Sequence, residues 1–243
     1  MLQMEYLQRV RELIDDLESK AAAQTEAAAE TIVEALVASN QFYISPLGHG
    51  NDGDLLHRAG GLVAARRFSF NLDIRDGGAS DRPREKPYDT GLEAARVAVR
   101  GSRMRAGDCI ILGSVSGRSS GPVSLAIAAG EIGATTIGIT SLEYSAQIAA
   151  SHSSGQKLDE VCDIVIDNCV PYGDAALAVP GLAEKAVPLS GLATTMTCWM
   201  ICSQVIEKLL VRGLEPSYYI SANRPDGPQF NEQMEEQCKR QGY

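Results

Sequence analysis

Residues 109–122 restrict the possible folds of this chain more than any other segment, because a short apolar run leads into a glycine- and serine-rich turn and then a helix start. The run 109–112 is rich in β-branched residues and too short for a helix, so it predicts a buried strand. Pro122 stands in the first turn of the apolar segment that follows, where its missing N–H costs little. The segment therefore predicts a strand–turn–helix unit.

The turn of this unit has the composition of an anion-binding site. Glycines let the backbone approach a ligand, serine hydroxyls donate hydrogen bonds, and the first N–H groups of a helix are unpaired. Ser114, Ser116 and Ser119 are spaced around Gly117, and Arg118 adds a positive charge. We expect these residues to bind an anion; a polar turn that only caps the helix is the alternative.

Strands and helices alternate along the rest of the chain. Strands are expected at 41–44, 68–72, 109–112, 134–139 and 163–167, and helices at 2–38, 55–63, 89–100, 122–129 and 190–212. This alternation predicts an α/β fold with a mainly parallel, five-stranded, flavodoxin-like sheet. In the doubly wound order 2-1-3-4-5, ligands bind between strands 1 and 3, and the glycine-rich turns 45–54 and 113–122 follow those two strands.

The chain shows no internal repeat and no linker, which predicts one domain at 39–223 with an N-terminal helical arm at 1–38 and a polar tail at 224–243. The arm packs either on another subunit or on its own domain. We expect at least a homodimer, because the arm precedes a complete α/β unit. The long polar segment 73–88 is expected to be a functional lid or disordered.

Charge and cysteine content narrow the class of protein. A net charge of −9 argues against nucleic acid or an anionic membrane as the main partner. An anionic metabolite would then need a locally positive site, which we expect Arg118 to supply with Arg75, Arg82 or Arg84. Six cysteines without a C-x-x-C pair, no apolar leader segment and no 18-residue apolar run predict a cytoplasmic protein with free thiols.

Three motifs resemble the SIS (sugar isomerase) family of phosphosugar-binding domains. Ser114-Val-Ser-Gly-Arg-Ser119 is similar to its Ser-x-Ser-Gly-x-Ser/Thr phosphate loop, and Gly48-His-Gly50-Asn51 to its glycine turn after strand 1. The stretches 139–145, 152–158 and 163–168 are similar to one bacterial branch. The resemblance covers roughly 30–223 and implies a three-layer α/β/α fold, a phosphorylated sugar as ligand, dimerisation, and Ser114, Ser116 and Ser119 as phosphate ligands.

The chain also departs from that branch, which commonly holds a His-Glu pair after strand 2. Arg75-Asp76 stands at this place, so a catalytic role there does not transfer. The altered stretch 51–54 and the arginine-rich segment 73–88 suggest a changed substrate. A sugar with another anion at C6, such as a sulfonate, is therefore a candidate beside a sugar phosphate.

Aldose–ketose isomerisation moves a proton between C1 and C2 through an enediol and needs a base and a hydroxyl-proton shuttle. We expect Glu143, just past the fourth strand, to be the base, with His152 or His49 handling hydroxyl protons. The alternatives are a helix-start role for Glu143, favoured by the helix dipole, and backbone bonding for His49. His57 is expected to be packed or solvated.

Three more residues follow strand ends at the ligand-binding edge and are expected to contact the sugar: Asn51, Thr140 and Ser141. Asp52, Asp54 and Asp76 are weaker candidates for the base. The stretch 51–54 lacks the spacing of a calcium loop, and the cysteines and histidines do not cluster as zinc ligands. We expect neither a metal nor another cofactor.

The sequence thus predicts an aldose–ketose isomerase acting on an anionic sugar. A phosphosugar lyase or etherase is the nearest alternative, because the same proton abstraction can lead to elimination. A non-catalytic sugar-phosphate sensor is a third possibility, although the N-terminal region has no basic recognition helix. Nucleotide binding is disfavoured, since the turn 48–50 lacks a third glycine and no Walker motif is present.

Overall fold

The computed structural model describes residues 1–49, 52–73, 75 and 89–243. The first half of the described chain holds α1 Leu2–Lys20, α2 Ala22–Val37, β1 Phe42–Ile44, α3 Asp52–Leu55, β2 Ala65–Arg67, α4 Thr90–Gly101, β3 Cys109–Gly113 and α5 Ser120–Glu131. The second half holds β4 Thr135–Thr140, α6 Leu142–Ala146, α7 Leu158–Val161, β5 Ile164–Asp167, the 3-10 turn η1 Tyr172–Asp174, α8 Ser190–Val211 and α9 Gly227–Gln241. Asn51, Asp76, Arg82 and Arg84 lie outside the described residues.

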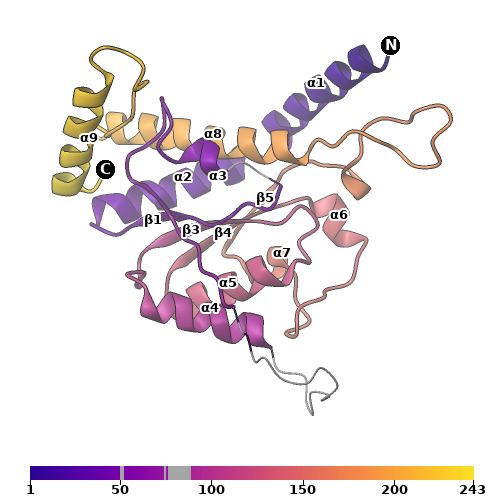
Figure 1. Ribbon diagram of the computed structural model, residues 1–243, viewed down its shortest axis with the longest axis horizontal. Coiled ribbons are helices and arrows are strands. Elements are labelled where there is room, and N and C mark those ends of the chain that lie inside the picture. Colours follow the sequence, from indigo (N-terminus) through magenta and orange to yellow (C-terminus); the bar gives the residue numbers. More distant parts are fainter. Residues whose placement is uncertain (50–51, 74, 76–88) are drawn as a thin grey trace.

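The five strands form one parallel sheet in the order β2-β1-β3-β4-β5, which confirms the predicted α/β fold and strand order. Helices cover both faces: α2 and α8 lie on one side, and α4, α5 and α7 on the other (Figure 1). Successive β3 residues alternate between the two cores, since Ile111 packs with α2 and α8 while Ile110 and Leu112 pack with α4 and α5. Both faces are thus buried, as in other parallel sheets.

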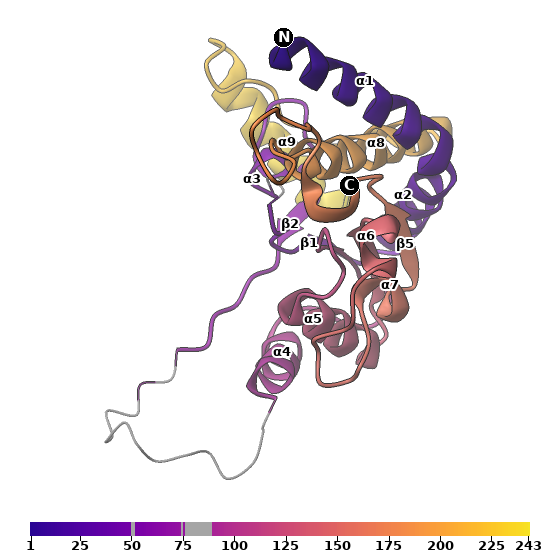
Figure 2. The same cartoon turned by 90° about the vertical axis from the view of Figure 1, so that its right-hand side faces the viewer.

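The predicted N-terminal helix is two helices. Ala21 interrupts it, and α1 then runs away from the sheet while α2 packs on the domain (Figure 2). Ile32, Val33 and Leu36 of α2 belong to the core under α8. The alanine-rich stretch before them has a high helix propensity on both sides of Ala21, so the sequence did not reveal the break.

Three other expectations need correction. The second strand is β2 at Ala65–Arg67, not 68–72, because Ala65 pairs with Phe42 and β2 is an edge strand that tolerates exposed arginines. The helix expected at 55–63 ends at Leu55, since His57 (φ 53°) and Gly60 (φ 85°) leave helical geometry. The tail, which has no core pattern in the sequence, contains α9, whose Cys238 is buried in the α2–α8 core.

All six cysteines are free thiols, and four of them are buried. Burial raises the pKa of the Cys109 and Cys202 thiols to about 12. No helix among the described residues has the length and apolar character needed to cross a membrane.

Candidate functional site

A cavity of about 550 Å³ opens at the carboxyl ends of β1 and β3, where the strand order reverses. The described residues that line it come from four segments of the chain. These are Pro46, Gly48 and His49 after β1; 113–116, Ser119 and Pro122 in and around the serine-rich turn; Tyr144 of α6; and Gly173 and Asp174 of η1. Its size falls in the range of small-molecule sites. The two glycine-rich turns therefore converge on one pocket, as the strand order predicts.

The serine-rich turn is held in place by its carbonyl groups. The Val115 carbonyl accepts hydrogen bonds from Ser141 N (2.9 Å) and Thr140 Oγ1 (3.3 Å), and the Gly117 carbonyl accepts one from Leu158 N (2.8 Å). Within the described part of the chain, by contrast, no group accepts a hydrogen bond from the N–H of Ser116 or Ser119. A turn that is held through its Val115 and Gly117 carbonyls and leaves the Ser116 and Ser119 N–H groups free is arranged to receive an anion.

Gly117 is required by this geometry. Its φ of 72° is left-handed, and a Cβ there would lie 3.0 Å from Asp159 Oδ1 and 3.1 Å from Ser145 Oγ. Any side chain would push the turn away from the 157–159 segment that anchors it.

The serine hydroxyls of the turn are preorganised. Ser114 Oγ, which is 6% exposed, donates to Ser119 Oγ at 3.1 Å. Ser119 is the N-cap of α5, but its side chain makes no capping hydrogen bond, so its hydroxyl can donate to a ligand. The N-terminus of the 12-residue α5 adds its partial positive charge at this point.

Two titratable side chains besides Tyr144 stand on the described wall of the pocket, His49 and Asp174. Asp174 accepts hydrogen bonds from Leu189 N (3.1 Å), Ser190 N (2.9 Å) and Ser190 Oγ, so its carboxylate holds the start of α8. His49 is exposed, and its carbonyl lies 3.2 Å from the Cβ position of Gly191 in α8. His49 is therefore the imidazole that a ligand in this pocket would meet.

The structure places Glu143 outside the described lining of the pocket. Its side chain is exposed and Oε1 accepts a hydrogen bond from Tyr172 N (3.1 Å), which ties α6 to η1. Tyr144 faces the pocket in its place and makes an edge contact with Tyr172 (ring centroids 4.9 Å). This geometry supports a positioning role for Glu143 rather than contact with substrate.

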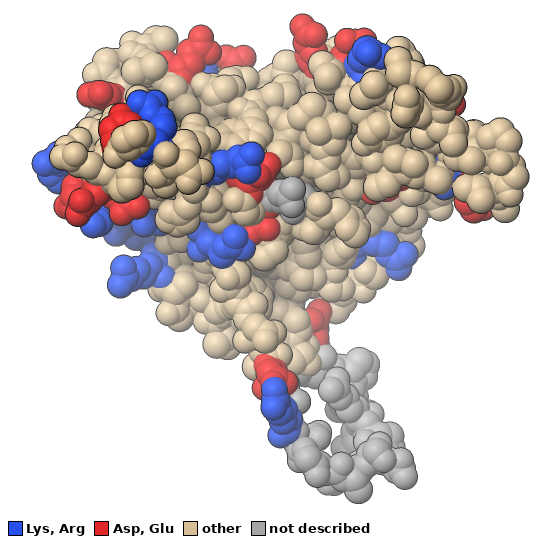
Figure 3. All heavy atoms as spheres, turned by 45° about the horizontal axis from the view of Figure 1, so that its top comes forward, with Lys and Arg blue, Asp and Glu red and all other residues tan. Residues whose placement is uncertain are grey.

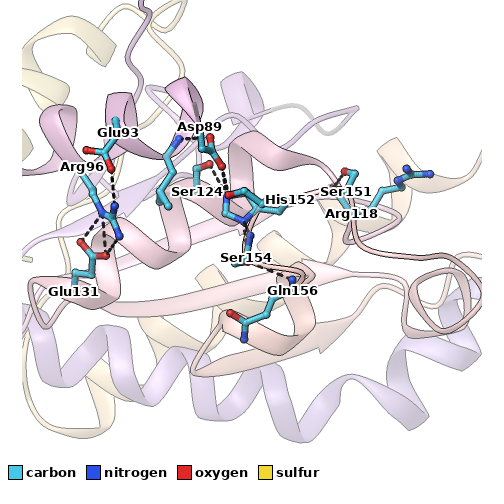
Figure 4. A network of polar contacts seen from close by, with 12 residues as sticks. Asp89, Glu93, Arg96, Arg118, Ser124, Glu131, Ser151, His152, Ser154 and Gln156 are labelled. Atoms are coloured by element: carbon cyan, nitrogen blue, oxygen red, sulfur yellow. Dashed lines mark hydrogen bonds and ion pairs between the residues drawn. The ribbon is translucent and has the colours of Figure 1, made fainter. Parts of the chain in front are cut away.

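His152 also lies away from the pocket, in a buried polar network (Figure 4). Its side chain is fully buried, and its Nδ1 accepts a hydrogen bond from Ser154 N (3.1 Å). That bond assigns the proton to Nε2, which donates to Ser124 Oγ at 3.0 Å, with Asp89 Oδ2 3.6 Å away. The His152 imidazole, with both nitrogens hydrogen-bonded, thus joins the loop 151–156 to α4 and α5.

The remaining predicted site residues among the described ones support the turns or lie on the surface outside the pocket lining. Thr140 and Ser141 are buried and support the turns, since Ser141 Oγ donates to the Val170 carbonyl and accepts from Tyr144 N. Arg118 is exposed and is not part of the described lining; its carbonyl accepts a hydrogen bond from Ser151 Oγ (2.6 Å). Arg75 pairs with Asp73 on the surface. Asn51 lies outside the described residues.

Sequence reasoning missed Tyr144 and Asp174 as pocket residues. Tyr144 directly follows the predicted Glu143, so its position at a strand end was a usable signal. Asp174 accepts a hydrogen bond from the first residue of α8, 16 residues later in the chain, and no local sequence pattern predicts that contact. The described residues contain no group of three or more His, Cys, Asp or Glu side chains placed to hold a metal ion.

Comparison with known proteins adds the family. The model of the SIS domain matches residues 5–141. A UPF0309 protein of Caldanaerobacter subterraneus subsp. tengcongensis is 30% identical over 241 residues, which cover 97% of this chain and 96% of that protein.

Two solved structures share the fold. The sugar isomerase domain of an RpiR transcription factor from Sphaerobacter thermophilus has a TM-score of 0.50 and 15% identity, covering 99% of this chain and 98% of that one. Phosphoheptose isomerase GmhA from Neisseria gonorrhoeae has a TM-score of 0.50 and 18% identity, covering 84% and 98%.

Proposed function

The chain belongs to the SIS domain family, and on that basis we propose that it is an aldose–ketose isomerase of an anionic sugar. The proposal rests mainly on the pocket itself. The serine-rich turn, with its free N–H groups and hydroxyls, and His49 line the same pocket. The turn would bind a C6 phosphate or sulfonate. The sugar carbons would then extend from the turn into the pocket.

In this proposal His49 transfers the proton. A general base takes the proton from C2 of the aldose, the enediol forms, and a proton returns to C1. Because His49 is the imidazole on the described pocket wall, it replaces Glu143 as the best-supported base. Glu143 and Tyr144 keep α6 and η1 in position, and Tyr144 also lines the pocket that would hold the sugar.

The test is a screen of sugar phosphates and C6-sulfonated hexoses by thermal shift, followed by proton NMR of the ligands that stabilise the protein. A ligand at 100 times its Kd adds about 2.7 kcal/mol of stability. An isomerase of this type exchanges the transferred hydrogen with D₂O and forms the ketose. Elimination of a substituent would instead identify a lyase or etherase, and stabilisation without turnover would identify a sensor.

We further propose that a second copy of the chain packs on α1. This helix exposes Leu2, Met4, Leu7 and Ile14, and an apolar groove between α1 and α8 is lined by Ile14, Leu17 and Trp199 among others. Light scattering should give about twice the chain mass of 25.9 kDa. Leu7→Glu with Ile14→Glu should restore the monomer mass, whereas Arg9→Glu on the same helix should not.

A further inference from the structure

A second cavity, of about 570 Å³, lies at the open edge of the sheet and shares no described lining residue with the pocket of the serine-rich turn. Its walls come from the edge strand β2, the end of β1, the loop after α4, and α9. The edge-cavity, as we call it, is therefore built from segments that the proposed function does not use.

The edge-cavity is cationic in a protein whose net charge is −9. The described residues that line it include the guanidinium groups of Arg66, Arg67 and Arg103 and the ammonium group of Lys239, against one carboxylate, Glu235. Figure 3 shows lysine and arginine side chains gathered on the side of the molecule where α9 lies. The lining of the serine-rich pocket, in comparison, includes no described lysine or arginine.

Two of these cations are available for a ligand. Arg67 pairs with Asp52, and Lys239 pairs with Glu236. Arg66 donates to the neutral Gln41 Oε1, and Arg103 makes no ion pair or hydrogen bond to any described residue. Two guanidinium groups without a carboxylate partner favour a multiply charged oxyanion, because the planar guanidinium binds two oxygens of a phosphate or carboxylate in a bidentate way.

The phenol of Tyr43 also lines the edge-cavity. Tyr43 is 7% exposed, its ring packs edge-on against Phe68 (centroids 6.0 Å), and its hydroxyl has no hydrogen-bond partner among the described residues. Its neighbour across the cavity, Tyr219, donates to Glu235 Oε1 (3.2 Å). The Tyr43 hydroxyl is not among the described polar atoms that are fully buried without a partner, so solvent reaches it and it can donate to a ligand in the cavity.

Both phenols stay protonated in this setting. Burial raises the pKa of Tyr43, and burial together with Glu235 raises the pKa of Tyr219 to about 12. Neither phenol therefore repels an anion, and Tyr43, whose proton is not already donated to a described acceptor, can donate to one. Exposed arginines on an edge strand also discourage edge-to-edge pairing, but that role gives no reason for a free hydroxyl at the base of a cavity.

From these contacts we infer that the edge-cavity is a second ligand site, which binds a small anion carrying two or more phosphate-type charges. Arg66 and Arg103 bind the anion from the rim, and the Tyr43 hydroxyl donates to it from the floor. The site is independent of the isomerase proposal, because it requires neither the serine-rich turn nor His49.

The test uses the full chain and inorganic pyrophosphate as the probe, measured by isothermal titration calorimetry. Binding is measured in a Ser116→Asp background, since a carboxylate in the serine-rich turn repels anions from that pocket. We expect one pyrophosphate per chain to bind there, with Kd rising about tenfold or more when Arg66→Gln and Arg103→Gln are combined. Tyr43→Phe, which removes only the hydroxyl, should weaken binding several-fold.

Arg100→Gln is the matched control, because Arg100 is an exposed arginine of α4 that pairs with Glu131 and does not line the cavity. Its Kd should stay unchanged. The inference is overturned if the Ser116→Asp protein binds no pyrophosphate at millimolar concentration, or if the double arginine variant binds as tightly as the Arg100→Gln control. Circular dichroism of each variant separates a lost site from a lost fold.

Discussion

Two groups of serine and histidine side chains, one at the serine-rich turn and one at the 151–156 loop, differ in what their polar atoms contact. In the serine-rich turn, Ser114 bonds Ser119, the N–H groups of Ser116 and Ser119 have no described acceptor, and His49 is exposed on the pocket wall. In the network of the 151–156 loop, His152 bonds Ser124 and Ser154 through its two ring nitrogens, and its side chain is fully buried.

The difference shows how the same residue types serve two purposes. A group whose donors are free at a cavity can bind a ligand, whereas a group whose donors and acceptors are all engaged stabilises the fold. We therefore expect substitutions in the first group to change turnover and ligand binding at constant stability. Substitutions in the second group should lower stability and leave the chemistry of the folded protein intact.

The largest effect is expected for His49→Gln, which keeps a side chain of similar size but cannot accept the C2 proton. Turnover should fall by roughly 10²–10⁴, while ligand-induced stabilisation remains. Deuterium incorporation from D₂O, followed by proton NMR, measures the loss. Glu143→Gln is the control and should exchange within a few-fold of the natural protein; normal exchange by His49→Gln and loss by Glu143→Gln would return the base to Glu143.

His152→Ala should give the next largest effect, on stability. The change leaves the buried Ser124 hydroxyl without its partner and opens a cavity between α4 and α5, so the free energy of unfolding should drop by about 2–4 kcal/mol. Urea denaturation measures this drop. His57→Ala, at an exposed histidine, should cost much less. Full stability together with a loss of turnover in His152→Ala would place His152 in the active site after all.

Ser116→Ala and Ser119→Ala should each weaken binding of the anionic sugar by roughly 1.5–3 kcal/mol, the usual value for a hydrogen bond to a charged group. The melting temperature without ligand should stay the same for Ser116→Ala, whose hydroxyl has no described partner, and should fall only slightly for Ser119→Ala, which removes the acceptor of Ser114 Oγ. Ser154→Ala provides the opposite pattern, with reduced stability and unchanged affinity. If both turn variants bind the sugar normally, the serine-rich turn is not the anion site.

Much of the fold could be predicted because the central strands are aliphatic on both faces. The aliphatic runs in β3, β4 and β5 are visible as strands, and a glycine-rich turn marks the end of β3. The edge strand β2 was predicted three residues too late in the chain. Its Arg66 and Arg67 do not give an apolar pattern, whereas Phe68, just beyond the strand, does. Helix α9 was missed because Cys238 is the main residue that it contributes to the core.

The parts of the candidate site that depend on one loop alone could be predicted from the sequence. The serine spacing around Gly117 and the turn at His49 are local patterns, and both reached the pocket. Whether Glu143 or Tyr144 faces the pocket depends on how α6 leaves β4, and the burial of His152 depends on Ser124 and Asp89 from distant helices. Such contacts are made only in the folded chain, so residue type alone could not show that Tyr144 lines the pocket or that His152 is buried.

The smallest expected effect is a pH dependence that arises in the His152 network. Hydrogen bonds from Ser153 and from Leu92 N hold the pKa of Asp89 below its usual value of 3.8. A carboxyl whose pKa is lower in the folded than in the unfolded chain stabilises the fold above the unfolded pKa, and this contribution disappears as the pH falls through the folded value.

Asp89→Asn keeps an acceptor for Leu92 N but does not titrate. The variant should be less stable than the natural protein near neutral pH by less than about 1 kcal/mol, because Asp89 is partly exposed to solvent, and the difference should shrink below about pH 4. Urea denaturation across this range measures it, with Ser116→Ala as a control that should show no such pH dependence. A stability difference that is constant with pH would mean that Asp89 stabilises the network through the hydrogen bonds of an α4 cap and not through its charge.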